Sequence, residues 1–189
     1  GTICVDSAGP ACGGEPESAG ATLKFFESLR MLTDHDKPLQ SLIIAHVTHA
    51  SKAGTTKSSP FGSVYWQNIP RQVFELQSAQ TQGTNHSDYA LHHRKSNLGP
   101  LQKPLAFRLT WGEGCIIEPI DLRHNPRLVA GLDLPDRVRI LLQGVSSITM
   151  RELADTTGFT ERAIAAELGQ DSRFTMDAMG AWSASESDW

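Results

Sequence analysis

Two short apolar runs flank a helical pattern at the start of the chain. Thr2 to Val5 is a β-prone run without polar alternation, which is typical of a buried parallel strand. Apolar residues at spacings of three and four follow and predict an amphipathic helix that begins near Pro16. Ser41 to Ala45 is a second continuous apolar run. Strand, helix and strand at this spacing predict a right-handed βαβ unit.

The pattern changes after the second run. Thr48 to Pro60 has no apolar periodicity and predicts a long mobile loop. A helix is expected from about Phe61 to Ile69. Three or four strands are expected to follow, near 71–76, 89–94, 105–111 and 115–119. Gly112-Glu113-Gly114 between the last two segments predicts a hairpin turn.

Short helices dominate the end of the chain. Thr149-Met150-Arg151-Glu152 has the pattern of a capping box, and Thr160 is placed to cap the next helix. The two helices are joined through Thr157-Gly158-Phe159, which predicts a helix-turn-helix. Phe174 and Trp182 flank a glycine-containing hairpin that would form a wing.

These elements predict an α/β fold with two domains. We expect a mainly parallel sheet in residues 1–120, a linker in residues 121–134 and a small winged helix-turn-helix domain in residues 135–189. A chain of 189 residues is long enough to bury a core in such an arrangement. The chain starts at Gly1, directly before a strand and without a signal segment, so we expect it to be a fragment.

Composition narrows the class of protein. Hydrophobic residues make up 39% and charged residues 20% of the chain, as in an ordinary globular protein, and no apolar run approaches the roughly 18 residues that cross a bilayer. We therefore expect no membrane partner. Cys4, Cys12 and Cys115 form an odd set without CxxC spacing, which argues against a disulfide framework and a zinc site. A reducing, cytoplasmic compartment is the expectation.

Charge is unevenly distributed. Residues 149–189 hold three arginines and eight acidic residues, a net charge of −5, whereas the whole chain has −4 and the first 148 residues therefore +1. Because nucleic-acid binding needs phosphate neutralisation, a nucleic-acid partner would more readily meet the first part of the chain.

Asp6 and His46 are the first candidates for chemistry. Each directly follows a predicted strand, and parallel strands bring their carboxyl ends to one edge of a sheet, where ligands bind in open α/β folds. Asp6 is placed to hold Mg²⁺ directly or through water. The structural alternatives are a helix cap for Asp6 and a hydrogen-bonded polar terminus for His46.

An ordered set of segments resembles the second half of the RecA-like P-loop ATPases over residues 2–118. The closest likeness is to the helicases of the RepA and DnaB type and the related AAA-family ATPases of mobile elements. The set comprises Ile3-Cys4-Val5-Asp6-Ser7, Ile43-Ile44-Ala45-His46, Phe61-Gly62-Ser63-Val64-Tyr65-Trp66, Asn68, Arg71, His93-Arg94-Lys95-Ser96-Asn97 and Leu105 to Gly114.

The resemblance implies a role for each candidate. Asp6, with Ser7 beside it, would be the Walker B aspartate that supports Mg²⁺ on the ATP phosphates, and His46 would sense the γ-phosphate. The loop from Thr48 to Pro60 would face single-stranded or duplex DNA in the central channel of a ring, with Lys52 and Lys57 as its cations. A further set would reach into the nucleotide site of the neighbouring subunit: Arg71, Arg94 and Lys95.

These roles agree with the physics of phosphoryl transfer, because a cation inserted from a neighbour can raise the rate by about 10³ to 10⁵. The resemblance thus implies a homo-oligomeric ring, a hexamer, that uses ATP and Mg²⁺ in plasmid or phage DNA replication. A solvated strand edge is the structural alternative for the three cations.

The chain departs from the family in two places. It contains neither a GxxxxGK[ST] phosphate loop nor the carboxylate that activates the attacking water, which both belong upstream, so the chain alone should not hydrolyse ATP. Ile69-Pro70 precedes Arg71, and a slip of one residue there would misplace that cation.

The C-terminal part resembles a winged helix with Thr160 to Leu168 as the recognition helix and Arg162 as its candidate DNA contact. The net charge of −5 opposes DNA binding, so a role of this domain in docking to a protein or in packing is an alternative to DNA recognition. A DNA- or protein-binding regulator that works through this domain is the competing function, and a strand-exchange recombinase is a third possibility. The histidines lack metal-ligand spacing, and no metal other than Mg²⁺ is expected.

Overall fold

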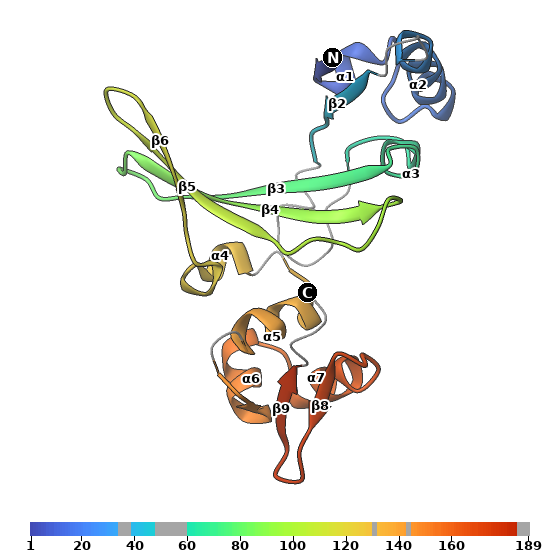
Figure 1. Cartoon of the computed structure of the whole chain (residues 1–189). Coiled ribbons are helices and arrows are strands. Elements are labelled where there is room, and N and C mark those ends of the chain that lie inside the picture. The colour runs from blue at the N-terminus through green and yellow to red at the C-terminus, as the bar shows by residue number, and fades with distance from the viewer. Residues whose placement is uncertain (34–38, 48–59, 130–131, 143–144, 185–189) are drawn as a thin grey trace. The chain divides into compact units, whose positions relative to one another are not determined.

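The computed structural model describes residues 1–33, 39–47, 60–129, 132–142 and 145–184 (Figure 1). The chain divides into two compact units. The first comprises residues 1–73 and 94–100, and the second comprises residues 74–93 and 101–189. No helix in the described parts is both long and apolar enough to span a membrane.

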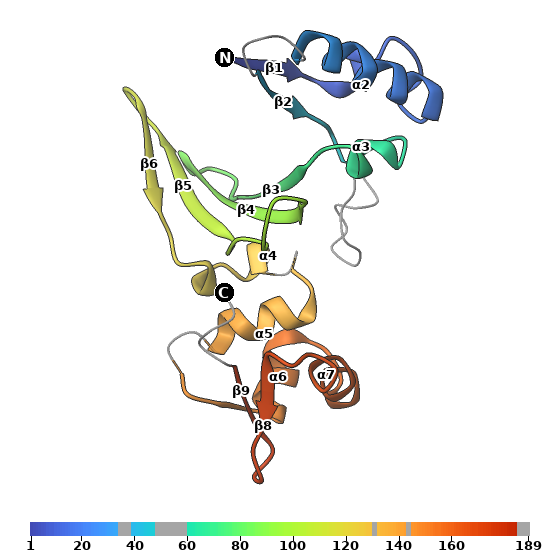
Figure 2. The same cartoon turned by 45° about the vertical axis from the view of Figure 1, so that its right-hand side comes forward.

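The first unit is built on two parallel strands, which lie next to each other in Figure 2. Its elements are β1 (Thr2–Asp6), α1 (Ala8–Ala11), α2 (Ala19–Thr33), β2 (Gln40–Ile44) and α3 (Tyr65–Asn68). Register pairs Thr2 with Gln40 and Asp6 with Ile44. The core of the unit lies between α1, α2 and α3, where Phe26, Leu29 and Trp66 are buried. The strand, helix and strand order and the parallel pairing of the predicted βαβ unit are confirmed.

A four-stranded sheet follows, in the order β3 (Gln72–Gln80), β4 (His86–Ser96), β5 (Leu105–Trp111) and β6 (Cys115–Pro119). β5 is antiparallel to both β4 and β6, and the predicted hairpin at Gly112 to Gly114 is present. Small residues of the sheet, Ala90 and Ala106, pack against Leu122, Leu128 and Ile140. These apolar residues come from η2 (Leu122–His124), from α4 (Pro126–Val129) and from α5 (Leu134–Leu142).

The end of the chain folds as three helices against a three-stranded antiparallel sheet. Its further elements are β7 (Ile148–Thr149), α6 (Met150–Thr157), α7 (Glu161–Leu168), β8 (Phe174–Met176) and β9 (Ala181–Ala184), with the strand order β7-β9-β8. Val138, Leu153, Ile164 and Leu168 are wholly buried in its core. The capping box at Thr149 and Glu152 is formed, and Gly158 ends α6 in the left-handed conformation with φ of 75°.

The fold is mixed α/β, as expected, but its sheets are not mainly parallel. In the described residues parallel pairing is limited to β1 and β2. The strands β3 to β6 are joined by residues 81–85, 97–104 and 112–114, and such short connections return the chain antiparallel because a parallel crossover needs a dozen or more residues. The expected linker at 121–134 holds η2 and α4, and the helix expected from Phe61 begins only at Tyr65.

Candidate functional site

The carboxyl edge of the parallel pair carries Asp6 and His46. Asp6 ends β1 opposite Ile44, the last residue of β2, and His46 follows two residues later. Both side chains are exposed, so both are accessible to a ligand. The backbone carbonyl of His46 accepts a hydrogen bond from the Phe61 N–H at 2.7 Å, and Val47 pairs with Pro60. These contacts hold residues 46–47 next to residues 60–61, beside the sheet edge that carries Asp6 and His46.

Ser7 lies at the start of α1 and is buried, with 7% of its surface exposed. It takes the N-cap position of this helix, although its hydroxyl makes no capping hydrogen bond. The segment that directly follows Asp6 is thus packed into the first unit rather than extended into solvent. Asp6 consequently projects from a fixed strand end.

Residues of the Phe61–Trp66 motif contribute to the fold rather than to the exposed edge. The Pro16 carbonyl accepts hydrogen bonds from the Ser63 N–H at 2.9 Å and from the Trp66 indole N–H at 3.0 Å. Gly62 has φ of 113°, and a Cβ atom there would lie 2.5 Å from the Pro16 carbonyl oxygen, so only glycine fits. The motif fastens α3 to the loop before α2.

Three predicted cations gather where β3 begins and β4 ends. Arg71 precedes β3, and its backbone carbonyl accepts the Asn97 N–H at 2.8 Å, just beyond β4. Arg94 and Lys95 are the last but two and last but one residues of β4. All three belong to the first unit together with Asp6 and His46. Arg71 is exposed and Arg94 is half-buried.

Lys95 has a structural partner that the sequence did not reveal. Its ammonium donates to the backbone carbonyls of Gln67 at 3.2 Å, Asn68 at 2.6 Å and Pro70 at 2.8 Å. These carbonyls lie at the C-terminal end of α3, where a helix leaves acceptors without an internal partner and a positive charge is favourable. Lys95 therefore uses its three donors within its own unit.

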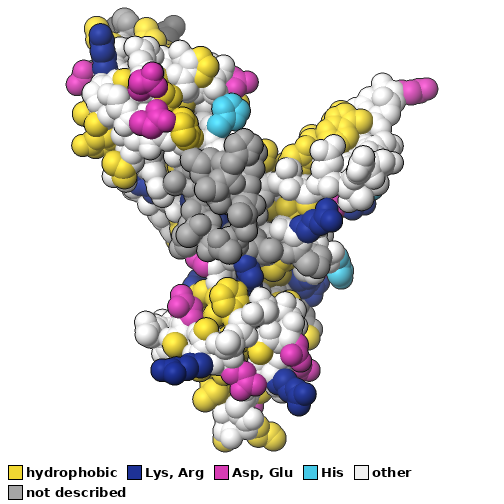
Figure 3. Space-filling model, turned by 180° about the vertical axis from the view of Figure 1, so that it is seen from behind, with side chains coloured by type: hydrophobic (Ala, Val, Ile, Leu, Met, Phe, Trp, Pro, Cys, Tyr) yellow, Lys and Arg dark blue, Asp and Glu magenta, His cyan; other side chains and the backbone are white. Residues whose placement is uncertain are grey.

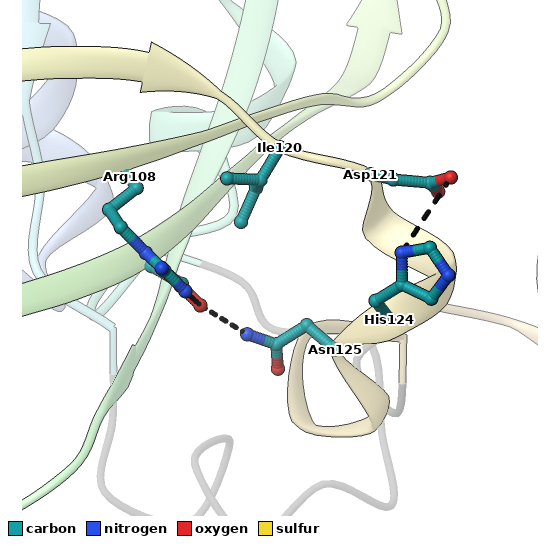
Figure 4. Close-up of a pocket in the computed structure, with 6 residues that line it drawn as sticks. Arg108, Ile120, Asp121, His124 and Asn125 are labelled. Carbon is teal, nitrogen blue, oxygen red and sulfur yellow. Dashed lines mark hydrogen bonds and ion pairs between the residues drawn. The ribbon is translucent and has the colours of Figure 1, made fainter.

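The second unit has a polar pocket of about 270 Å³, which lies beside η2 (Figure 4). Arg108 on β5 donates to both carboxylate oxygens of Asp88 on β4, at 2.6 and 3.0 Å. Asn125 donates to the same carboxylate at 2.9 Å. These hydrogen bonds, above all those from Arg108, hold the pKa of Asp88 below its usual range. The carboxylate is thus an ion-pair anchor, and a poor general acid or base.

Asp121 and His124 line the other side of this pocket. Hydrogen bonds from the Arg123 side chain and backbone lower the pKa of Asp121 to about 2. The His124 ring lies 3.9 Å from the Asp121 carboxylate and is largely exposed. None of these residues was a candidate from the sequence. Asp88, directly before the segment predicted at 89–94, was the one signal, but its partner Arg108 depends on the strand register.

Of the predicted DNA contacts, Arg162 lies within the described residues and belongs to neither cluster. Arg162 is exposed on α7, next to Glu161 and five residues before the exposed Glu167. Lys52 and Lys57, and the predicted mobile loop that carries them, lie outside the described residues.

Asp6 was predicted to hold Mg²⁺ for ATP. Among the described residues, no group of three or more His, Cys, Asp or Glu side chains could hold a metal ion. A single carboxylate still fits Mg²⁺, which proteins bind through one or two carboxylates together with water and substrate phosphates. Asp6 could thus serve as one ligand of Mg²⁺, but the chain has no glycine-rich phosphate loop to hold ATP.

Comparisons with known proteins give no family for this chain. No protein-family model, no curated protein and no solved structure matches it.

Proposed function

We propose that the chain is the second half of a RecA-like P-loop ATPase of the RepA-type hexameric helicase group, with a winged-helix domain behind it. The observation that supports the proposal most is the parallel register of β1 and β2, which leaves Asp6 and His46 at one exposed edge. Carboxyl ends of parallel strands are where nucleotides bind in open α/β sheets.

A phosphate-binding segment would complete this sheet. A parallel sheet of two strands is too small to be stable alone, and β2 pairs with no second neighbour among the described residues. A further strand beside β2 would deliver its loop to the edge that holds Asp6 and His46. The proposal assigns that strand, with the glycine-rich loop, to the sequence upstream.

Asp6, His46 and the segment that follows His46 have different roles in this proposal. Asp6 supports the Mg²⁺ that neutralises charge on the ATP phosphates, with Ser7 beside it, and His46 links the presence of the γ-phosphate to the segment that follows. That segment carries Lys52 and Lys57 toward DNA. Its two ends are tied together by the Val47–Pro60 pairing, so a displacement at His46 would be passed to both.

Arg71 and Arg94 are the cations proposed to act on the neighbouring subunit's nucleotide. Lys95, whose ammonium is engaged by three carbonyls of α3, is better suited to position the end of β4 that carries Arg94. A guanidinium supplied by a neighbour makes hydrolysis depend on assembly, because neither subunit alone stabilises the charge on the transferred phosphoryl group. The functional unit is therefore a homo-oligomeric ring.

The test uses the gene product that contains this chain together with its upstream sequence. ATP hydrolysis should rise on addition of single-stranded DNA, and His46→Ala should abolish that rise while nucleotide binding persists.

Mixing subunits tests the ring: Asp6→Ala and Arg71→Ala proteins should each be inactive alone, and their mixture should regain activity where an intact Asp6 faces an intact Arg71. Arg94→Ala is mixed with Asp6→Ala in the same way. Absence of a phosphate loop upstream, or of any DNA-stimulated hydrolysis, would refute the proposal.

A second candidate function is a regulator that binds DNA or protein through the C-terminal domain. It is supported by α6 and α7, joined by a tight turn at Gly158 and followed by the β8–β9 hairpin, which has the element order of a winged helix. Fluorescence anisotropy of the whole chain on duplex DNA, with Arg162→Ala as the variant, separates the candidates. Strong binding that Arg162→Ala weakens would favour the regulator.

A further inference from the structure

The four-stranded sheet has two faces of opposite character. On one face small and polar side chains, among them Ala90, Ala106 and Asp88, pack against or hydrogen-bond to η2, α4 and α5. Side chains alternate along a strand, so the other face, here called the open face, is set by the strand register. It comprises the odd-numbered residues of 87–93, 105–111 and 115–119 and, because Phe74 stacks on His93, the even-numbered residues of 74–80. Ser87 and His93 on this face are buried.

The open face holds most of the bulky apolar side chains of the sheet. Five of them are exposed, by 43 to 67% of their surface: Phe74, Leu76, Leu105, Trp111 and Ile117. Hydrophobic side chains are visible along the β5–β6 arm in the space-filling view (Figure 3). Contiguous apolar exposure of this kind marks an interaction surface, whereas single exposed apolar residues do not.

The aromatic side chains of this face are ordered. The Tyr89 and Phe107 rings stack across β4 and β5 with centroids 5.5 Å apart, and the Phe74 and His93 rings stack with centroids 4.5 Å apart. His93 accepts the Gln102 N–H at 3.0 Å, which fixes its ring. His93 is buried and Tyr89 and Phe107 are half-buried, so these rings are already held in place and lose little conformational entropy when a partner covers the exposed residues beside them.

None of the fifteen positions of the open face holds Asp, Glu, Lys or Arg. Aromatic rings can stack on nucleic-acid bases, but such sites need lysine or arginine to follow the phosphates. An anionic membrane surface likewise needs basic residues. The absence of charge instead allows the face to meet an identical copy of itself without any like-charge pair.

We propose that the open face is the interface of an isologous homodimer, in which two copies of the chain stack their β3–β6 sheets. Stacked sheets pack about 10 Å apart with their strands about 30° from parallel, as in a β-sandwich. Two-fold symmetry places the same surface on both subunits, so the face must be complementary to itself. The contact differs from the head-to-tail contact of a ring, and it does not depend on the ATPase proposal.

The size of the face suits such a dimer. Four strands at about 4.8 Å spacing and about seven residues at about 3.3 Å each give a footprint of roughly 400 to 500 Å². Two copies would bury on the order of 1,000 Å² or somewhat more, near the lower limit for a specific interface. We therefore expect a reversible dimer with a dissociation constant in the micromolar range, rather than an obligate one.

Neighbouring residues of β6 provide a matched pair of variants. Ile117 lies on the open face opposite Leu109, and Ile116 lies on the other face opposite Thr110, with 67 and 59% of their surfaces exposed. Lysine at 117 would place an ammonium in the apolar interface and should weaken dimerisation at least tenfold. Lysine at 116 makes the same change of charge and size outside the interface and should leave dimerisation within about twofold of the original.

Sedimentation equilibrium of the whole chain, across a micromolar concentration series, measures these constants. Leu76→Lys on β3 provides an independent variant and should act like Ile117→Lys. Circular dichroism of each variant shows whether it has kept its fold. A monomer at every concentration, or equal weakening by Ile116→Lys and Ile117→Lys, would overturn the dimer. So would a monomer that uses Ile117 to bind oligo-dT or neutral phosphatidylcholine vesicles, because a different occupant would then cover the face.

Discussion

Lys95 shows how a candidate functional residue can be engaged by the fold. It lies beside Arg94 in a motif that the resemblance links to nucleotide, yet its ammonium is bonded to three carbonyls at the end of α3. A charged donor that bonds helix carbonyls without an internal partner stabilises a fold. When the donor is removed, only water can hydrogen-bond those carbonyls.

Lys95→Met should lower the free energy of unfolding by about 1 to 2 kcal/mol, because methionine keeps the aliphatic stem but has no donor. Urea denaturation followed by tryptophan fluorescence measures this change, since Trp66 lies in the same unit. Lys24→Met removes an exposed lysine from α2 and is the control. Equal stability of the Lys95 variant and the control would mean that the carbonyl contacts contribute nothing.

Asp136 gives the chain a pH-dependent stability. Burial at the start of α5, reinforced by the neighbouring Asp133 carboxylate, raises the pKa of Asp136 to about 6, although Arg173 and Arg139 oppose the shift. The folded state thus binds a proton that an unfolded aspartate, with its pKa near 3.9, releases earlier. Stability therefore falls as the pH rises from about 4 to about 6.

Asp136→Asn should remove this penalty, because asparagine is neutral at every pH. We expect the variant to melt about 2 to 5 °C higher than the original chain at pH 7.5, and the difference should close toward pH 4. Differential scanning calorimetry at several pH values tests this, with the exposed Asp155→Asn on α6 as control. A variant that melts lower at pH 7.5 would show that attraction to Arg173 outweighs burial.

At the scale of elements, α6 is the helix whose start is best defined. The Thr149 hydroxyl accepts the Glu152 N–H at 3.3 Å, and the Glu152 carboxylate accepts the Thr149 N–H at 2.9 Å. Both contacts satisfy donors that a helix start otherwise leaves to solvent. Because β7 leads directly into α6, the same contacts fix where the strand ends.

Thr149→Ala should cost about 1 kcal/mol, the usual effect of losing a polar N-cap. Thermal unfolding monitored by far-UV circular dichroism gives the difference, and Thr156→Ala, exposed near the end of the same helix, controls for the loss of a threonine. If both substitutions lowered the melting temperature equally, the cap would have no special role.

At the scale of the whole molecule, local signals predicted most of the elements. Parallel pairing of the first strands followed from two apolar runs around an amphipathic helix, and the caps of α6 and α7 followed from threonine three residues before its partner N–H. These features depend on neighbours in sequence, which a pattern can reveal.

Long-range features could not be predicted in this way. The antiparallel order of β3 to β6 depends on which strands pair, and the Asp88–Arg108 ion pair depends on the register between β4 and β5. The Lys95 contacts join residues 25 to 28 positions apart. The residues of the candidate edge were predicted individually, but the interactions that hold their surroundings depend on tertiary structure.

The boundary between the two units is crossed three times by the chain, after Val73, after His93 and after Pro100. No single proteolytic cut therefore separates the two units. A cut after Val73 leaves residues 94–100 of the first unit on the fragment that holds the second, and a cut after Pro100 leaves residues 74–93 of the second unit on the fragment that holds the first. A deletion at either boundary thus leaves one unit incomplete, with a piece of it attached to the other. Point substitutions in the intact chain are the appropriate way to separate the roles of the two units.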